Sequence, residues 1–131
     1  MPRNRRHYRI KLGDAISAHE IAILYGGRSG IQDQNLIESA ICRPYNGYYR
    51  PIYKKAAALV HSVACNHGFT DGNKRTAFIL CNLFLEKSGY RLRETENDNG
   101  DLESLILGLA TRAIGFEEAV EWFKQYVDEV P

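Results

Sequence analysis

The chain has few cysteines, almost no excess charge and no long hydrophobic run. Its three cysteines (Cys42, Cys65 and Cys81) are odd in number and share no C-x-x-C spacing, which excludes a disulfide framework and a zinc site. They are typical of reduced thiols in a cytoplasmic protein, and we expect Cys42 and Cys81 in the core. With 17 basic and 16 acidic residues the net charge is +1, so nucleic acid is not an expected partner.

The sequence shows neither the pattern of a signal peptide nor that of a membrane-spanning segment. The N-terminus is basic but lacks the apolar run that a signal peptide requires. The most apolar stretch, residues 78–85, contains Asn82 and is far too short to cross a bilayer. We therefore expect a cytoplasmic protein that does not enter a membrane.

The length and composition predict one domain with its own core. The chain has 131 residues, of which 44% are hydrophobic. Residues 1–11 form a basic arm, interpreted as a solvated tail in preference to an arm that touches a partner. Residues 12–131 form the single domain. The basic residues of the arm are Arg3, Arg5, Arg6, Arg9 and Lys11.

Apolar periodicity predicts an all-α fold. We expect a compact six-helix domain built around one buried central helix, because residues 78–85 are apolar on nearly every side. No segment keeps a period of two, so a sheet is not expected, and Tyr90 begins at most a short extended piece. The predicted helices cover approximately residues 14–25, 33–42, 52–65, 73–88, 102–114 and 116–127.

Several single positions carry narrower expectations. Ser17 and Glu20 have the spacing of a capping box for the first helix. The glycine-rich residues 26–30 match no phosphate-loop pattern and are interpreted as a helix stop and turn. His19 is expected on the surface without a role, and His61 as a hydrogen-bonded structural histidine.

The most informative stretch is His-Gly-Phe-Thr-Asp-Gly-Asn-Lys-Arg-Thr-Ala, residues 67–77. Its Asp-Gly-Asn segment is turn chemistry, and Asp and Asn are preferred helix N-caps, so the central helix should begin near Asn73. The first backbone N–H groups of a helix are unpaired and lie at the positive end of its dipole. Gly72, Asn73 and the following residues therefore predict an anion site suited to phosphate.

The charged residues of this stretch extend the prediction. Lys74 and Arg75 fall in the first turn, where the helix dipole disfavours cations unless an anion binds there. Asp71 is the only carboxylate near them in the sequence, and one carboxylate plus phosphate oxygens commonly hold Mg²⁺. His67 is placed to accept a proton near neutral pH. The simpler alternative is a turn, a cap, a loop histidine and a solvated face.

Residues 44–51 form a loop with three tyrosines, two prolines and an arginine. Exposed aromatic and arginine side chains on a loop are typical of a recognition surface. The alternative is that the rings pack over the edge of the core, and the sequence does not decide between the two. The candidate groove residues are Tyr45, Tyr48, Tyr49 and Arg50.

The stretch at residues 67–77 resembles the signature of the Fic/Doc (Fido) superfamily. That signature runs His-x-Phe-x-Asp/Asn-Gly/Ala-Asn, then Gly or Lys, then Arg, and its Doc branch of death-on-curing toxins carries Asn-Lys-Arg-Thr-Ala. Residues 24–27, 30–33 and 36–44 are similar to the family's Tyr-Gly-Gly turn and the helix after it, and residues 84–90 to the end of its central helix. The resemblance covers roughly residues 12–128.

The resemblance implies transfer of a phosphorus-containing group from ATP to a protein hydroxyl. Most Fic enzymes transfer AMP, with glycine where this chain has Lys74 and arginine where it has Phe78. Doc toxins carry lysine at the first position, lack the arginine, and phosphorylate a threonine of elongation factor Tu, which blocks translation. This chain agrees with Doc at both positions, so the resemblance implies a Mg-ATP-dependent protein Ser/Thr kinase that is the toxin of a bacterial toxin–antitoxin module.

The resemblance also assigns roles and a partner. His67 accepts the proton of the target hydroxyl, Asp71 holds Mg²⁺, and Gly72 to Arg75 bind phosphate, while Phe69 buries the loop. Gly68 departs from the proline of Fic motifs, and Cys65 from a basic residue of some Doc relatives. A cognate antitoxin with a disordered inhibitory segment would fold onto the groove at residues 45–53. The alternatives are a Fic-type adenylyltransferase and a non-catalytic binding module of the same fold.

Overall fold

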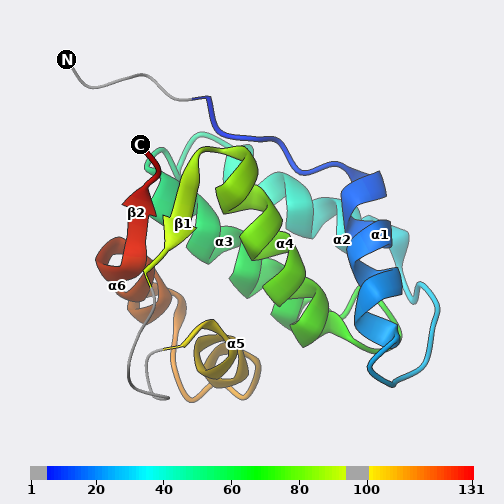
Figure 1. Ribbon diagram of the computed structural model, residues 1–131. Coiled ribbons are helices and arrows are strands. Elements are labelled where there is room, and N and C mark those ends of the chain that lie inside the picture. Colours follow the sequence, from blue (N-terminus) through cyan, green and yellow to red (C-terminus); the bar gives the residue numbers. More distant parts are fainter. Residues whose placement is uncertain (1–5, 94–100) are drawn as a thin grey trace.

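The computed structural model describes residues 6–93 and 101–131 (Figure 1). The predictions for Arg3 and Arg5 in the arm lie outside these ranges. Within them the chain forms six α-helices, which confirms the all-α class. The elements are α1 (Leu12–Ile23), α2 (Gln34–Cys42), the 3-10 turn η1 (Arg43–Tyr45), α3 (Ile52–Cys65), α4 (Asn73–Lys87), β1 (Tyr90–Leu92), α5 (Leu102–Ala110), α6 (Phe116–Tyr126) and β2 (Val127–Glu129).

The centre of the domain is the packed pair α3 and α4 (Figure 1). The alanines of α3 at positions 56–58 are fully buried and allow close approach, while Leu80 and Phe84 of α4 fill the space between the helices. α1 covers α4 on one side and α6 covers α3 on the other (Figure 1). The expectation that α4 is apolar and buried all round is wrong on one face, because Phe78 is 40% exposed.

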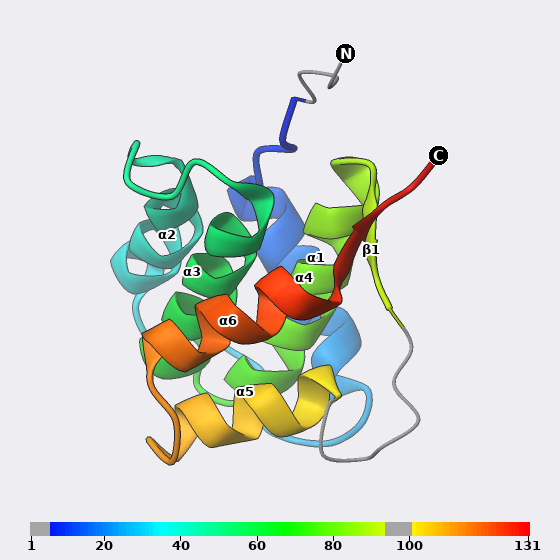
Figure 2. The ribbon, with the colours of Figure 1, turned by 90° about the vertical axis from the view of Figure 1, so that its left-hand side faces the viewer.

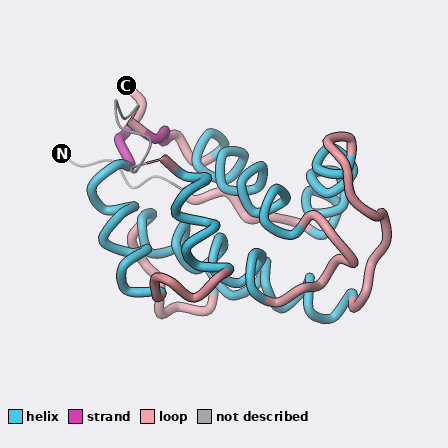
Figure 3. Tube along the Cα trace, turned by 90° about the horizontal axis from the view of Figure 1, so that it is seen from below, coloured by secondary structure: helices cyan, strands magenta, loops and turns pink. Residues whose placement is uncertain are grey.

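A small ribbon at the end of α4 corrects the expectation that no sheet forms. β1 pairs antiparallel with β2, with Tyr90 opposite Glu129 and Leu92 opposite Val127. The predicted sixth helix therefore ends one residue early, at Tyr126. Strands of three residues are too short for a period of two to be visible in the sequence. Figure 3 shows both strands at the corner where the chain ends.

The helix boundaries follow local capping chemistry. Asp33 caps α2 by accepting the N–H of Asn35 at 2.9 Å, as expected. The predicted Ser17 capping box is wrong, because α1 already begins at Leu12 and the Asp14 carboxylate accepts the N–H of Lys11 at 2.9 Å. α5 ends at Ala110, before the expected Ile114.

The cysteines and the arm differ in part from expectation. Cys81 is buried, which confirms its place in the core, whereas Cys42 at the end of α2 is exposed. The described end of the arm is not a free tail. Ile10 is buried, and the N–H of Tyr8 donates to the Ser88 hydroxyl at 2.8 Å. No helix in the described ranges is both long enough and apolar enough to cross a membrane.

The helices α5 and α6 complete the side of the domain away from α1. Figure 2 shows α6 crossing in front of α3, with α5 below it. α5 contacts both α3 and α4, and its buried face includes Leu105, Ile106 and Leu109. α5 also forms one wall of the cleft that is described next, opposite residues of the first turns of α4.

Candidate active site

The loop between α3 and α4 is held by a second loop that lies alongside it. The carbonyl of Gly68 accepts the N–H groups of Gln32 and Asp33 at 2.9 and 3.0 Å, and the N–H of Thr70 donates to the carbonyl of Gly30 at 3.0 Å. Ile31 and Phe69 form an antiparallel bridge between the two loops. The stretch that carries the motif is therefore fixed by backbone hydrogen bonds before any ligand binds.

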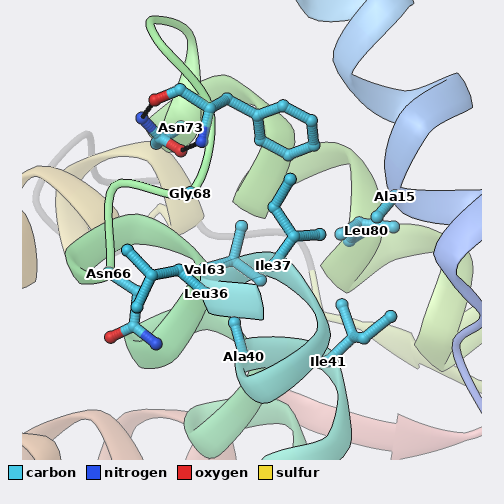
Figure 4. A pocket seen from close by; sticks show the side chains of 11 residues that line it. Ala15, Leu36, Ile37, Ala40, Ile41, Val63, Asn66, Gly68, Asn73 and Leu80 are labelled. Atoms are coloured by element: carbon cyan, nitrogen blue, oxygen red, sulfur yellow. Dashed lines mark hydrogen bonds between the residues drawn. The ribbon is translucent and has the colours of Figure 1, made fainter. Parts of the chain in front are cut away.

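The Asn73 side chain closes the motif loop on itself. Its Oδ1 accepts the N–H of Phe69 at 3.1 Å, and its Nδ2 donates to the carbonyl of Phe69 at 3.0 Å (Figure 4). Both ends of the amide are thus occupied, and the side chain is nearly buried. Asn73 was expected to bind phosphate; in this geometry its side chain shapes the loop, and its backbone N–H is the group left for a ligand.

Gly68 packs where a side chain has no room. A Cβ at this position would lie 2.5 Å from Cγ1 of Ile37 and 3.0 Å from its backbone nitrogen. Gly68 and Ile37 both line a small apolar cavity of about 10 Å³ behind the loop, and Figure 4 shows the residues around it. The departure from the proline of Fic motifs therefore has a local reason, which is close contact between the loop and α2.

His19 is a site residue that the sequence analysis missed. It is 5% exposed, not on the surface as expected. Its Nε2 donates to the Asp71 carbonyl at 2.8 Å, since a carbonyl can only accept, and its ring stacks on Phe69 with centroids 3.9 Å apart. Ala15, Ala18 and Ala22 recur at helical spacing and form the buried stripe of α1, and His19 lies on the same stripe. This spacing could have predicted from the sequence that His19 is buried. The burial of Phe69 at 2% confirms its role as an anchor.

The first turn of α4 presents open N–H groups. Gly72 is the N-cap in the left-handed conformation, with φ of 76°, which favours glycine. The N–H of Thr76 donates to the Gly72 carbonyl at 2.9 Å, so the intrahelical ladder begins there. Among the described residues the N–H groups of Asn73, Lys74 and Arg75 have no hydrogen-bond partner. An anion placed before this turn would meet three donors and the positive end of the helix.

The Asp71 carboxylate is fixed and ionised. Oδ2 accepts the N–H of Arg28 at 3.1 Å, and Oδ1 accepts the N–H of Gly72 at 2.8 Å. These two hydrogen bonds lower the pKa of Asp71, the bond from Arg28 most strongly. Each oxygen retains a lone pair, which fits a single-carboxylate Mg²⁺ site completed by phosphate. No group of three or more His, Cys, Asp or Glu side chains within the described ranges could hold a metal without such help.

His67 stands at the edge of the same site with its ring free. Its side chain is exposed, and its backbone is in the left-handed region with φ of 54°. The imidazole forms no hydrogen bond with any residue in the described ranges. A non-glycine residue held at positive φ is strained, and here the strained backbone aims an unpaired imidazole at the cleft.

The motif lies at the floor of a cleft of about 840 Å³. The floor is polar and contains His67 and residues 70–75. The walls are largely apolar and come from the end of α1 with the turn after it, from one side of α4 and from α5. Glu103 of α5 also lines the cleft, which therefore contains a second carboxylate besides Asp71. The wall residues include Ile21, Tyr25, Phe78, Ile79, Ile106, Leu107, Ala110 and Thr111.

The tyrosine-rich loop does not take part in this cleft. The hydroxyl of Tyr45 donates to the Tyr8 carbonyl at 2.6 Å, and its ring meets Phe84 near the far end of α4. The Tyr49 ring packs edge-on against Phe116. For these two rings the packing alternative is correct, while Tyr48 and Arg50 are exposed. The predicted groove therefore lies at the opposite end of α4 from the motif.

Two further predicted positions are also structural. His61 accepts a hydrogen bond from Arg43, with Nδ1 and Nη1 2.7 Å apart, which confirms its structural role. The Cys65 thiol donates to the Leu109 carbonyl at 3.6 Å and does not line the cleft. Burial raises the pKa of this thiol, so Cys65 is an inert side chain between α3 and α5.

Fold and site together define a helical domain in which the open N-terminus of α4 and an exposed histidine lie at the floor of one cleft. The Fic/DOC family model matches residues 9–85. Toxin Doc of Mycolicibacterium smegmatis is 36% identical over 104 residues, 76% of this chain and 78% of the relative. Protein kinase doc of Escherichia phage P1 is 27% identical over 117 residues, 86% of this chain and 90% of the relative. The chain belongs to the Fic/DOC family.

Proposed function

We propose that this chain is the toxin of a bacterial toxin–antitoxin module and acts as a Doc-type protein Ser/Thr kinase. The observation that carries the proposal is the first turn of α4, where three open N–H groups and two cations meet the ionised Asp71 and the free ring of His67. Phosphoryl transfer asks mainly for positioned reactants and neutralised charge, and this turn supplies both. The names of the two relatives, a Doc toxin and a doc protein kinase, point the same way.

Each residue has a defined task in this reaction. The N–H groups of Asn73, Lys74 and Arg75 bind phosphate oxygens, with the Lys74 ammonium as a point charge and the Arg75 guanidinium as a fork. Asp71 holds Mg²⁺, which neutralises phosphate charge when ATP binds. The hydrogen bonds between the two loops at Gly68 and Thr70 keep these groups in place before any ligand binds.

The transfer step begins with a serine or threonine hydroxyl of the target. Its oxygen attacks the γ-phosphorus of ATP, a new P–O bond forms, and the bond from the γ-phosphorus to the β–γ bridging oxygen breaks, releasing ADP. The hydroxyl proton passes to the imidazole of His67, which has no competing partner in the described structure.

Two side chains favour transfer of phosphate over transfer of AMP. Lys74 is exposed in the first turn and lines the cleft, where an AMP-transferring Fic enzyme has glycine. Phe78 offers an apolar edge one turn later, where that branch has arginine. The chain thus places cationic charge at the start of α4 and none at position 78, which suits a nucleotide whose terminal phosphate lies over the first turn.

The decisive test uses purified elongation factor Tu, the target implied by the Doc resemblance, with Mg²⁺ and ATP labelled in either the γ- or the α-phosphate. The kinase proposal predicts label from γ-labelled ATP only, lost in Lys74→Gly. Label from α-labelled ATP would replace it with adenylyl transfer. If wild-type protein binds ATP but transfers label from neither form of ATP, elongation factor Tu is not the target. The target would then be sought among the proteins of a whole lysate.

We propose that a cognate antitoxin in the cytoplasm of the bacterial host inhibits the activity of this chain. The chain has no Ser/Thr-x-x-x-Glu-Gly/Asn stretch of the kind that inhibits many Fic proteins from within. A partner with a disordered segment that folds on the toxin would supply the missing restraint. Expression of this chain should arrest growth, and co-expression of a small protein encoded beside it should restore growth. Arrest that no neighbouring protein relieves would contradict this part of the proposal.

A further inference from the structure

Tyr25 is an exposed aromatic residue at the mouth of the cleft. It lies on the turn after α1, is 72% exposed and lines the cleft. Its ring has a cation beside it, because the guanidinium carbon of Arg75 lies 4.9 Å from the ring centroid. This distance is within the range of a cation–π contact. An exposed tyrosine is thus joined to a cation of the first turn of α4.

Among the described residues, the Arg75 side chain has one further polar contact, which comes from α1. Its Nη1 donates to the Ala22 carbonyl at 3.5 Å, which is a long and weak hydrogen bond. That carbonyl belongs to the last turn of α1, the negative end of this helix. No carboxylate in the described ranges forms an ion pair with Arg75. The ring and the helix end therefore direct the guanidinium while leaving most of its five donors for a ligand.

We propose that Tyr25 is a positioning residue for Arg75. Its ring holds the guanidinium at the cleft, ready for the phosphates of a nucleoside triphosphate; this inference rests on the proposed function of the site. A long arginine side chain loses rotamer freedom when it binds a ligand, and a side chain that is already held loses less. Tyr25 thereby increases the affinity for nucleotide without touching it.

The expected effect follows from the size of an exposed cation–π contact. Replacing Tyr25 by leucine should raise the Kd of a non-hydrolysable Mg-ATP analogue by about two- to fivefold. Tyr25→Phe keeps the ring face and should bind as tightly as the wild type. KM for ATP should follow Kd, while kcat changes less. Tyr48→Leu is the matched control, because Tyr48 is 83% exposed and lies on the loop at the far end of α4.

A double-mutant cycle separates positioning from direct contact with the nucleotide. If Tyr25 acts through Arg75, Tyr25→Leu should have no further effect on Kd in an Arg75→Ala background. An equal loss in both backgrounds would mean that the ring itself touches the nucleotide, and it would overturn the proposal. Tighter binding by Tyr25→Leu would overturn it as well, since the ring would then withhold Arg75 from the phosphates.

An NMR measurement without nucleotide tests the Tyr25–Arg75 pairing separately from the proposed kinase function. The Nε–H resonance of Arg75 should carry a ring-current shift in the wild type and in Tyr25→Phe, and lose it in Tyr25→Leu. A resonance that does not move in Tyr25→Leu overturns the pairing even where ATP binds. A normal shift in a protein that binds no ATP overturns the proposed function, and with it the role of the Tyr25–Arg75 pair in nucleotide binding.

Discussion

At the scale of single residues, the motif divides into side chains that build the loop and side chains left for chemistry. Asn73 and Phe69 bind each other and bury the loop. His67 and Lys74 remain exposed in the cleft, without hydrogen bonds to the residues described. Substitutions in the first group should therefore cost stability, while substitutions in the second should cost activity alone.

His67→Asn should abolish transfer and leave the fold intact. Asparagine tolerates the left-handed backbone that His67 adopts, so the substitution removes the proton acceptor without adding strain. Loss of general-base catalysis should lower the rate by about 10²–10⁴-fold. The measurements are label transfer and thermal unfolding. A variant with the wild-type rate would contradict the role of His67.

Asn73→Asp should destabilise the protein although its shape is conserved. The carboxylate cannot donate to the Phe69 carbonyl, which would be left without its 3.0 Å hydrogen bond. Leaving one buried partner unsatisfied costs about 1–3 kcal/mol. Chemical denaturation measures the loss, with Asn82→Asp on the exposed face of α4 as control. Equal stability of Asn73→Asp and the wild type would show that the amide is not needed to close the loop.

At the scale of elements, the site depends on contacts between segments that are far apart in the sequence. α1 reaches the motif loop through His19, which donates to the Asp71 carbonyl. α2 reaches it through Ile37, which leaves no room for a side chain at Gly68. The start of α4 is therefore held from two sides by helices that contribute nothing to the motif itself.

Gly68→Ala tests the contact between the loop and α2. The new Cβ would lie 2.5 Å from the Ile37 side chain and 3.0 Å from its backbone nitrogen, so the loop or the helix must shift. Overpacking of this kind costs roughly 1–3 kcal/mol, and the shift should also lower transfer. Gly13→Ala in α1 is the matched control, because a Cβ there meets nothing within 4 Å. Both substitutions having the same effect on unfolding would argue against the contact.

The elements also show what the sequence could and could not predict. The α3 boundaries and the Asp33 cap were predictable because periodicity and capping are local. The position of His19 was within reach, since it lies on the stripe of buried alanines of α1. The β1–β2 ribbon was not, because each strand has three residues and the pairing joins positions far apart in the chain. The packing of Tyr45 on Tyr8 depends likewise on tertiary contacts.

At the scale of the whole molecule, His7 and His61 make the free energy of unfolding depend on pH. Each ring accepts a hydrogen bond from a cationic side chain, Lys55 for His7 and Arg43 for His61. Burial, and then the charge of Arg43, lowers the pKa of His61 from its ordinary 6.5. Burial, and then the charge of Lys55, lowers the pKa of His7. A lowered pKa means that the unfolded chain binds these protons more readily than the folded one.

The protein should therefore lose stability as the pH falls below 6.5. The contribution of both histidines is fully present above this value and is lost as the pH falls toward their lowered pKa values. Denaturant unfolding at several pH values between about 5 and 8 measures the slope. His61→Gln, which still offers an oxygen to Arg43, should flatten it. A free energy of unfolding that rises on acidification would contradict this assignment.

The open first turn of α4 is the part of the molecule on which the proposed activity depends. The family signature made this turn recognisable from the sequence, since the signature residues are contiguous. The cleft walls were not predictable, because α1, α4 and α5 contribute them from three separate parts of the chain. The candidate partner groove at Tyr45 lies at the other end of α4, a position that the sequence did not indicate, and its role stays a prediction.

The most direct test is the response of backbone amide resonances to a Mg-ATP analogue. If the first turn of α4 binds the phosphates, the N–H signals of Asn73, Lys74 and Arg75 should move most, and Asp71→Asn should weaken the effect of Mg²⁺. The N–H signals at residues 45–50 should stay in place. Largest shifts at that loop, or at any surface outside the cleft, would contradict the central claim that phosphate binds at the start of this helix.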